Sequence, residues 1–147
     1  MKPEETVDFH IKRTWYAISR MYNDRALEYS STMATGFVLL NIDLVDGTPA
    51  TKLGPQMGME PHSLSRTLKS MEEKGLIQRK PDPTDGRGVL INLTKEGLSK
   101  RDMAKHAVLI FNERVSEELS EEEVKTCIKV LSVINRVIEN KGIYKND

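Results

Sequence analysis

The chain has 147 residues with a single cysteine, and its 22 basic side chains balance its 22 acidic ones. This length is enough for one domain with a buried core, whereas one cysteine excludes an intrachain disulfide framework and a multi-cysteine metal site. The N-terminus lacks an apolar signal-peptide region and no run reaches the length of a membrane span, so we expect a cytoplasmic protein with no membrane partner.

Two amphipathic helices are predicted at the start of the chain. Apolar side chains recur at three- and four-residue steps over residues 7–22, which indicates a helix of roughly six turns. The same pattern continues over residues 33–44, behind a cap at Ser31 or Thr32. Asp46-Gly47 is predicted to close this second helix.

A short helix, a turn and a polar helix are predicted next. The short helix covers residues 50–57, Gly58 makes the turn, and Pro61 is a favourable first residue for the polar helix. The apolar stripe of the polar helix consists of Leu64, Leu68 and Met71. This order predicts a helix-turn-helix.

A β-hairpin is predicted directly after the polar helix, which Gly75 ends. Its arms are residues 76–79 and 89–93, and the proline and glycines of residues 82–88 indicate the turn between them. Arg87 lies at the predicted tip. Such a hairpin can lie on a nucleic-acid backbone and insert a guanidinium into a groove.

Two long helices complete the chain. Thr94 is a plausible cap for the first, and Ser120 with Glu123 forms a capping box for the second. Their apolar stripes, like that of residues 7–22, exceed what a small winged module can bury, so we expect packing against a second copy. The predicted fold class is therefore mainly α with a small β wing (α+β), a winged helix-turn-helix with N- and C-terminal dimerisation helices.

Three segments, residues 58–68, 71–77 and 82–97, resemble the MarR family of prokaryotic transcription regulators in their turn and recognition helix, helix-to-strand exit and wing. The resemblance implies a single domain over residues 1–147. Its DNA-binding part would cover about 31–100 and its dimerisation helices about 5–30 and 101–142. It also implies a homodimer on a pseudo-palindromic operator, with recognition helices in the major groove and wings in the minor groove. Gly54-Pro55 departs from the family pattern and predicts an irregular short helix.

Candidate DNA contacts on the recognition helix lie in the basic part of the chain, because residues 61–101 contain nine basic and five acidic side chains. Serine hydroxyls suit phosphate contacts, and arginine or histidine can reach base edges. The candidates are His62, Ser63, Ser65, Arg66 and Lys69. Each is ordinary helix surface in the alternative interpretation.

On the wing, Arg87 is the strongest candidate, since narrow minor grooves attract arginine; the alternative is a solvated loop arginine. Asp85 is expected to support the wing, either by an ion pair with Arg87 or as a turn-forming residue. Arg79 and Lys80 are interpreted as phosphate contacts or as strand-edge charges that discourage aggregation.

Other side chains offer weaker signals. A pocket for a small organic effector is predicted among Trp15, Met33, Phe37 and Phe111, although these are also typical of plain core. The three histidines show no metal-ligand spacing, so no metal is expected. The single cysteine, Cys127, lies beside an apolar stripe and is expected to be a buried thiol, with redox sensing as the alternative.

The sequence is interpreted as a sequence-specific DNA-binding transcription regulator, a ligand-responsive repressor that acts as a homodimer. The alternative is a winged-helix interaction or dimerisation module without specific DNA binding. Retained Ser65, Arg66 and Arg87 favour the first interpretation. Because the sequence has no nucleophile motif, paired carboxylates or phosphate-binding glycine loop, it predicts neither an enzyme nor a cofactor.

Overall fold

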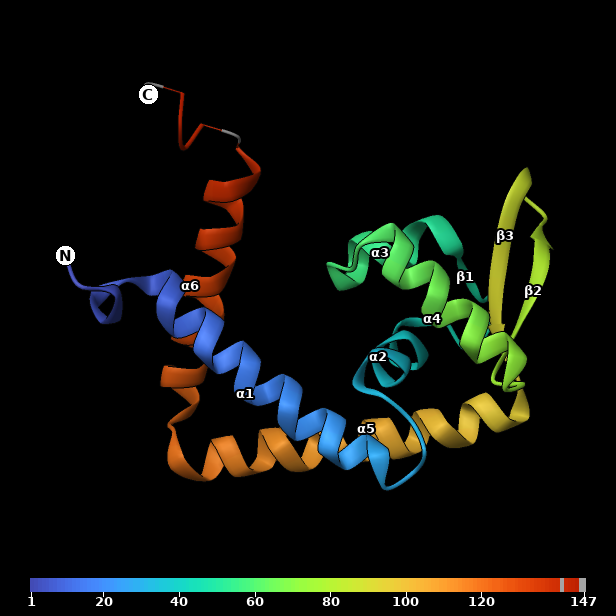
Figure 1. The fold of residues 1–147 in the computed structure, drawn as a ribbon, viewed down its shortest axis with the longest axis horizontal. Coiled ribbons are helices and arrows are strands. Elements are labelled where there is room, and N and C mark those ends of the chain that lie inside the picture. The colour runs from blue at the N-terminus through green and yellow to red at the C-terminus, as the bar shows by residue number, and fades with distance from the viewer. Residues whose placement is uncertain (141, 146–147) are drawn as a thin grey trace. The chain divides into compact units, whose positions relative to one another are not determined.

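The computed structural model describes residues 1–140 and 142–145 (Figure 1). Most of the described residues are helical and the remainder include one small sheet, which confirms the predicted class of a mainly α fold with a small β wing. The chain forms two compact units, Met1–Ala107 and Val108–Asp147. The boundary between them falls inside helix α5 (Lys95–Glu118).

The first unit opens with a short 3-10 turn, η1 (Pro3–Glu5), followed by α1 (Val7–Leu27) and α2 (Met33–Asn41). Thr32 caps α2 as predicted, because its hydroxyl accepts a hydrogen bond from the backbone N–H of Thr35 at 3.1 Å. This bond satisfies one of the donors that a helix N-terminus leaves free.

The predicted end of α2 at residues 46–47 is wrong, because the helix already stops at Asn41. The loop after it folds around Asp43, whose carboxylate accepts the backbone N–H of Asp46 at 2.8 Å. The backbone N–H of Asp43 donates to the hydroxyl of Thr48 at 2.8 Å. An aspartate that bonds nearby backbone in this way favours a turn over another helical turn.

The helix-turn-helix consists of α3 (Ala50–Met57) and α4 (Pro61–Glu73), with the bounds of α3 as predicted. Gly58 and Gly75 follow the two helices with φ of +61° and +72°, the left-handed conformation that ends helices and favours glycine. Pro55 lies in the last turn of α3, and the helix continues through it.

A three-stranded antiparallel sheet joins the helix-turn-helix to the wing. Its strands are β1 (Thr48–Pro49), β2 (Ile77–Asp82) and β3 (Asp85–Leu93), in the order β1-β3-β2. Ile77 pairs with Leu93 at the base of the hairpin. The sequence predicts only β2 and β3, because a two-residue strand is too short to show an alternating pattern.

The predicted turn over residues 82–88 is also wrong in extent, since the strands continue to a two-residue turn at Pro83 and Thr84. Asp82 holds this turn by accepting the backbone N–H and the hydroxyl of Thr84 at 2.9 and 2.8 Å. Gly86 and Gly88 lie within β3, and neither has a positive φ. A Cβ at Gly88 would lie 3.2 Å from the Cβ of Asp82, so close packing is what favours glycine there.

The core of the first unit lies where α2, α3, α4 and the sheet meet. It contains the three predicted apolar positions of α4 and is completed by side chains from the other elements. The buried members are Val38, Leu39, Ile42, Leu53, Leu64, Leu68, Met71, Leu76, Ile77 and Ile91. This shared core fixes the helix-turn-helix and the base of the wing to each other.

A tight joint connects the end of α4, the base of the wing and the start of α5. Thr94 donates its backbone N–H to the carbonyl of Leu76 at 3.1 Å and its hydroxyl to the carbonyl of Gly75 at 2.5 Å. The same hydroxyl accepts the N–H of Gly97 at 3.0 Å, the predicted cap. A Cβ at Gly97 would lie only 1.9 Å from the carbonyl oxygen of Leu76, so this position has room for hydrogen alone.

The second unit contains the C-terminal part of α5 and helix α6 (Glu121–Glu139), which the predicted capping box of Ser120 and Glu123 opens. Cys127 is exposed, so the expectation of a buried thiol is wrong for the single chain. The reason is that the apolar side chains beside it are exposed as well. They include Ile128, Leu131 and Ile138.

Candidate DNA-binding surface

Four candidate side chains share the outer face of α4. Their positions fall within an arc of about 100° on a helix with 3.6 residues per turn, opposite the buried stripe. All four are exposed, and they are His62, Ser65, Arg66 and Lys69. Among the described residues, no hydrogen bond or ion pair engages the cationic groups of Arg66 and Lys69, so both charges face solvent.

Ser63 differs from the other α4 candidates. It lies at the flank of the exposed arc and is half-buried. Its carbonyl accepts the hydroxyl of Thr67 at 2.9 Å, one turn further along the helix. Its own hydroxyl therefore reaches a different part of the surface from that of Ser65, and contact of either serine with phosphate stays a prediction.

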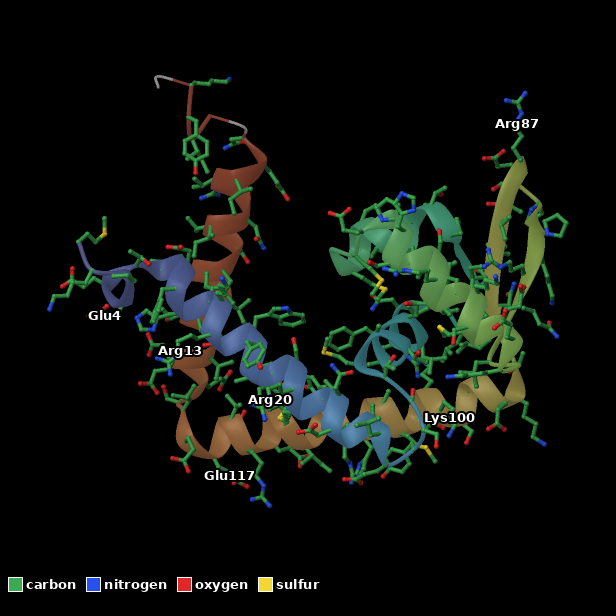
Figure 2. The ribbon with its side chains drawn as sticks, viewed as in Figure 1. Glu4, Arg13, Arg20, Arg87, Lys100 and Glu117 are labelled. Atoms are coloured by element: carbon green, nitrogen blue, oxygen red, sulfur yellow. The ribbon has the colours of Figure 1, made fainter. Side chains whose placement is uncertain are left out.

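Arg87 lies at the far end of the hairpin, and Figure 2 shows its side chain pointing away from the helices. Its backbone N–H donates to the carboxylate of Asp85 at 3.1 Å. Among the described residues no ion pair joins the two side chains, and the carboxylate of Asp85 bonds local backbone instead; support of the wing by Asp85 stays a prediction. The guanidinium of Arg87 is left free to reach a partner.

Arg79 and Lys80 lie side by side on β2 but differ in their surroundings. The Nε atom of Arg79 lies 3.3 Å from a carboxylate oxygen of Glu72 on α4. Lys80 is exposed, and within the described part of the chain no carboxylate pairs with it. Arg79 also lines a groove between α3 and α4 together with Ser65 and Leu68.

Three residues that the sequence analysis did not single out shape this surface, and they are Lys52, Glu72 and Thr84. Hydrogen bonds from the backbone and hydroxyl of Thr84 lower the pKa of Asp82, and Lys52 on α3 contributes a smaller electrostatic effect in the same direction. Lys52 therefore brings one more exposed cation towards the wing. Glu72 gave no signal, because its partner across the helix-to-strand turn depends on the tertiary fold.

Three of the side chains predicted for an effector pocket belong to the first unit. Trp15 stacks on Phe37 with ring centroids 6.4 Å apart, and Tyr22 packs edge-on against Phe37 at 5.9 Å. Met33 begins α2 on the same unit, whereas Phe111 belongs to the second unit. Burial raises the pKa of Tyr22, which the sequence analysis did not include in the cluster.

Over residues 1–140 and 142–145, no group of three or more histidine, cysteine or acidic side chains could hold a metal ion. None of the helices in this part of the chain is both long and apolar enough to cross a bilayer.

Comparisons with known proteins agree with this geometry. A family model described as "MarR family" matches residues 32–89. The HTH-type transcriptional regulator SarZ of Staphylococcus aureus is 30% identical over 97 residues, a match that spans 65% of this chain and 66% of SarZ. CouR from Rhodococcus jostii RHA1, solved with p-coumaroyl-CoA, is 25% identical with a TM-score of 0.80, covering 91% of this chain and 94% of CouR. A mutant of MarR from E. coli, solved with operator DNA, is 25% identical with a TM-score of 0.73, covering 84% and 89%.

Proposed function

Because the chain belongs to the MarR family, we propose that it is a sequence-specific DNA-binding regulator that acts as a homodimer on a pseudo-palindromic operator. The MarR mutant solved with operator DNA supports this proposal by its likeness to the chain. In a prokaryotic cell such a regulator acts in the cytoplasm, where the chromosome lies.

The unpaired cations on two connected elements carry the proposal. Arg66 and Lys69 face solvent from α4, and Arg87 does so from the far end of the hairpin. A helix of this kind fits the major groove, where arginine can bond guanine and serine can bond phosphate. The hairpin then brings Arg87 to the neighbouring minor groove, and Lys80 to the phosphate backbone.

The exposed apolar side chains of α1 and α6 support the homodimer. Val7 and Trp15 on α1, and Ile128 and Ile138 on α6, are each more than half exposed in the single chain, between 52% and 59%. Several large apolar side chains exposed along one helix favour an interface with a partner. A two-fold dimer would present two copies of α4 to half-sites about one helical turn of DNA apart.

We also propose that a small organic ligand releases the protein from DNA, so that it acts as a repressor. The stacked rings of Trp15 and Phe37, with Met33 on the same unit, offer apolar surface for such a ligand. CouR was solved with p-coumaroyl-CoA, which supports an organic effector by analogy. A ligand that favours a non-binding spacing of the two recognition helices by about 1–3 kcal/mol would give typical allosteric coupling.

A gel shift tests the central claim. The probe is the DNA immediately upstream of the chain's own coding sequence, with an excess of unrelated duplex as competitor at fixed salt. We expect a shifted complex that survives the competitor. Loss of the shifted complex when the unrelated duplex is added would favour the alternative function, an interaction module without specific DNA binding.

A further inference from the structure

We propose that Glu72 and Arg79 form a positioning pair that holds the wing at a fixed angle to the recognition helix α4. The proposal rests on the proposed DNA-binding function, and it gives Arg79 a role other than phosphate contact. Glu72 lies at the C-terminal end of α4 and Arg79 on β2, with Nε and Oε2 3.3 Å apart. The side chain of Arg79 is 36% exposed and that of Glu72 is 46% exposed, so the pair is partly shielded from solvent.

This pair differs in kind from the other ion pairs in the described part of the chain. There are four such pairs, and three of them join residues three or four positions apart, at helical spacing. Only the pair of Glu72 and Arg79 connects two different elements among the described residues. It bridges the turn at Gly75 by which the chain leaves α4 and enters the wing.

The position of Arg79 on the sheet explains how the pair can control the wing. Arg79 is paired in register with Ile91, which is fully buried and belongs to the core. One rung further on, Leu90 still pairs with Pro49 of β1, and beyond that rung Pro81 and Val89 are exposed. The pair therefore lies close to the base of the exposed part of the wing.

The length of the exposed part of the wing amplifies any tilt at its base. The four steps from Arg79 to Pro83 span about 13 Å at roughly 3.3 Å per residue. A tilt of about 10° at the base would move the tip by roughly 2 Å over this length. Because hydrogen bonds to DNA tolerate only a few tenths of an ångström around about 2.9 Å, such a shift would break the contacts of Arg87.

The effect on DNA affinity of removing the Glu72 charge has opposite signs for a positioning pair and for direct phosphate contact by Arg79. A carboxylate on the DNA-facing side normally repels phosphate, so its removal should strengthen binding to any DNA. If Arg79 contacted phosphate directly, neutral Glu72 would also free its guanidinium and strengthen binding further. If the pair positions the wing, loss of Glu72 instead weakens binding to the specific site.

The test compares Glu72→Gln and Arg79→Gln with two matched controls, Glu73→Gln and Lys80→Gln. Glu73 and Lys80 are exposed neighbours that carry the same charges, and neither has an ion-pair partner among the described residues. Each full-length variant is titrated by fluorescence anisotropy at fixed salt. The probes are the upstream duplex that the wild type binds and an unrelated duplex of equal length.

We expect Glu72→Gln and Arg79→Gln each to lower affinity for the upstream duplex about two- to fivefold, the range that one exposed ion pair supports. The double variant should be no weaker than the weaker single variant, because both changes remove one interaction. Glu73→Gln should instead strengthen binding to both duplexes slightly, and Lys80→Gln should weaken both equally. Stronger binding of Glu72→Gln to the upstream duplex, or additive losses in the double variant, would overturn the proposal.

A second measurement separates this proposal from the proposed function. If the wild type does not distinguish the two duplexes, the proposed function fails, and amide hydrogen exchange then decides the role of the pair without DNA. Glu72→Gln and Arg79→Gln should accelerate exchange in β2 and β3 to the same extent, while Glu73→Gln should not. Unchanged exchange in both variants would show that the pair does not hold the wing.

Discussion

Gly97→Ala should destabilise the protein strongly, although alanine is the better helix former. The new Cβ would lie 1.9 Å from the carbonyl oxygen of Leu76, a backbone atom that cannot turn aside like a flexible side chain. Moving it away weakens the hydrogen bonds of Thr94 to Leu76 and Gly75. Overpacking costs about 1–3 kcal/mol and two weakened bonds roughly 1 kcal/mol each, while alanine returns about 1 kcal/mol of helix propensity.

The net loss in the free energy of unfolding is therefore about 2–4 kcal/mol, or roughly 5–15 °C in melting temperature for a chain of this size. Circular dichroism melting and urea titration measure both quantities. Gly36→Ala is the matched control, because Gly36 also lies inside a helix but its new Cβ would meet only Ala104, at an ordinary 3.4 Å. If Gly97→Ala melted with the wild type or with Gly36→Ala, the argument from the tight joint would be wrong.

Three further predictions concern function. Arg87→Ala should weaken binding to the upstream duplex by about 1–3 kcal/mol with an unchanged melting curve; equal affinity at fixed salt would show that the wing arginine does not contact DNA. Sedimentation at micromolar concentration should give about twice 16.7 kDa; a monomer would refute the dimer. Cys127→Ser should leave DNA binding and effector response intact, because the candidate DNA contacts all lie in the other unit. Peroxide that released the wild type but not this variant would point to redox control.

Local signals in the sequence were sufficient for most of the helices. The bounds of α3, the caps at Thr32 and Ser120, and the apolar stripe of α4 were predicted, because helical periodicity and capping are set by residues three or four positions apart. The end of α2 was not. There Asp43 forms a turn in which its backbone N–H donates to the hydroxyl of Thr48, outside the local helical pattern.

The wing shows where sequence reasoning fails for a physical reason. The glycines at 86 and 88 indicated a turn, yet both lie in β3. At position 88 the close packing of Asp82 leaves little room for a side chain. A glycine can serve either positive φ or close approach, and composition does not distinguish the two. Only the register of the strands decides which of them applies.

The three-dimensional fold also decides which charged side chains are free at the surface. Asp85 and Arg87 are two positions apart and looked like a natural ion pair, but the carboxylate bonds the backbone of Arg87 instead. Arg79 looked free and is paired with Glu72, seven positions away across a turn. The carboxylate of Asp85 can accept a backbone N–H two residues away without extending into solvent. Glu72 meets Arg79 because the core already brings α4 and β2 together. The free guanidinium at the tip and the engaged one at the base thus follow from the fold, and this difference underlies the separate roles that we propose for Arg87 and Arg79.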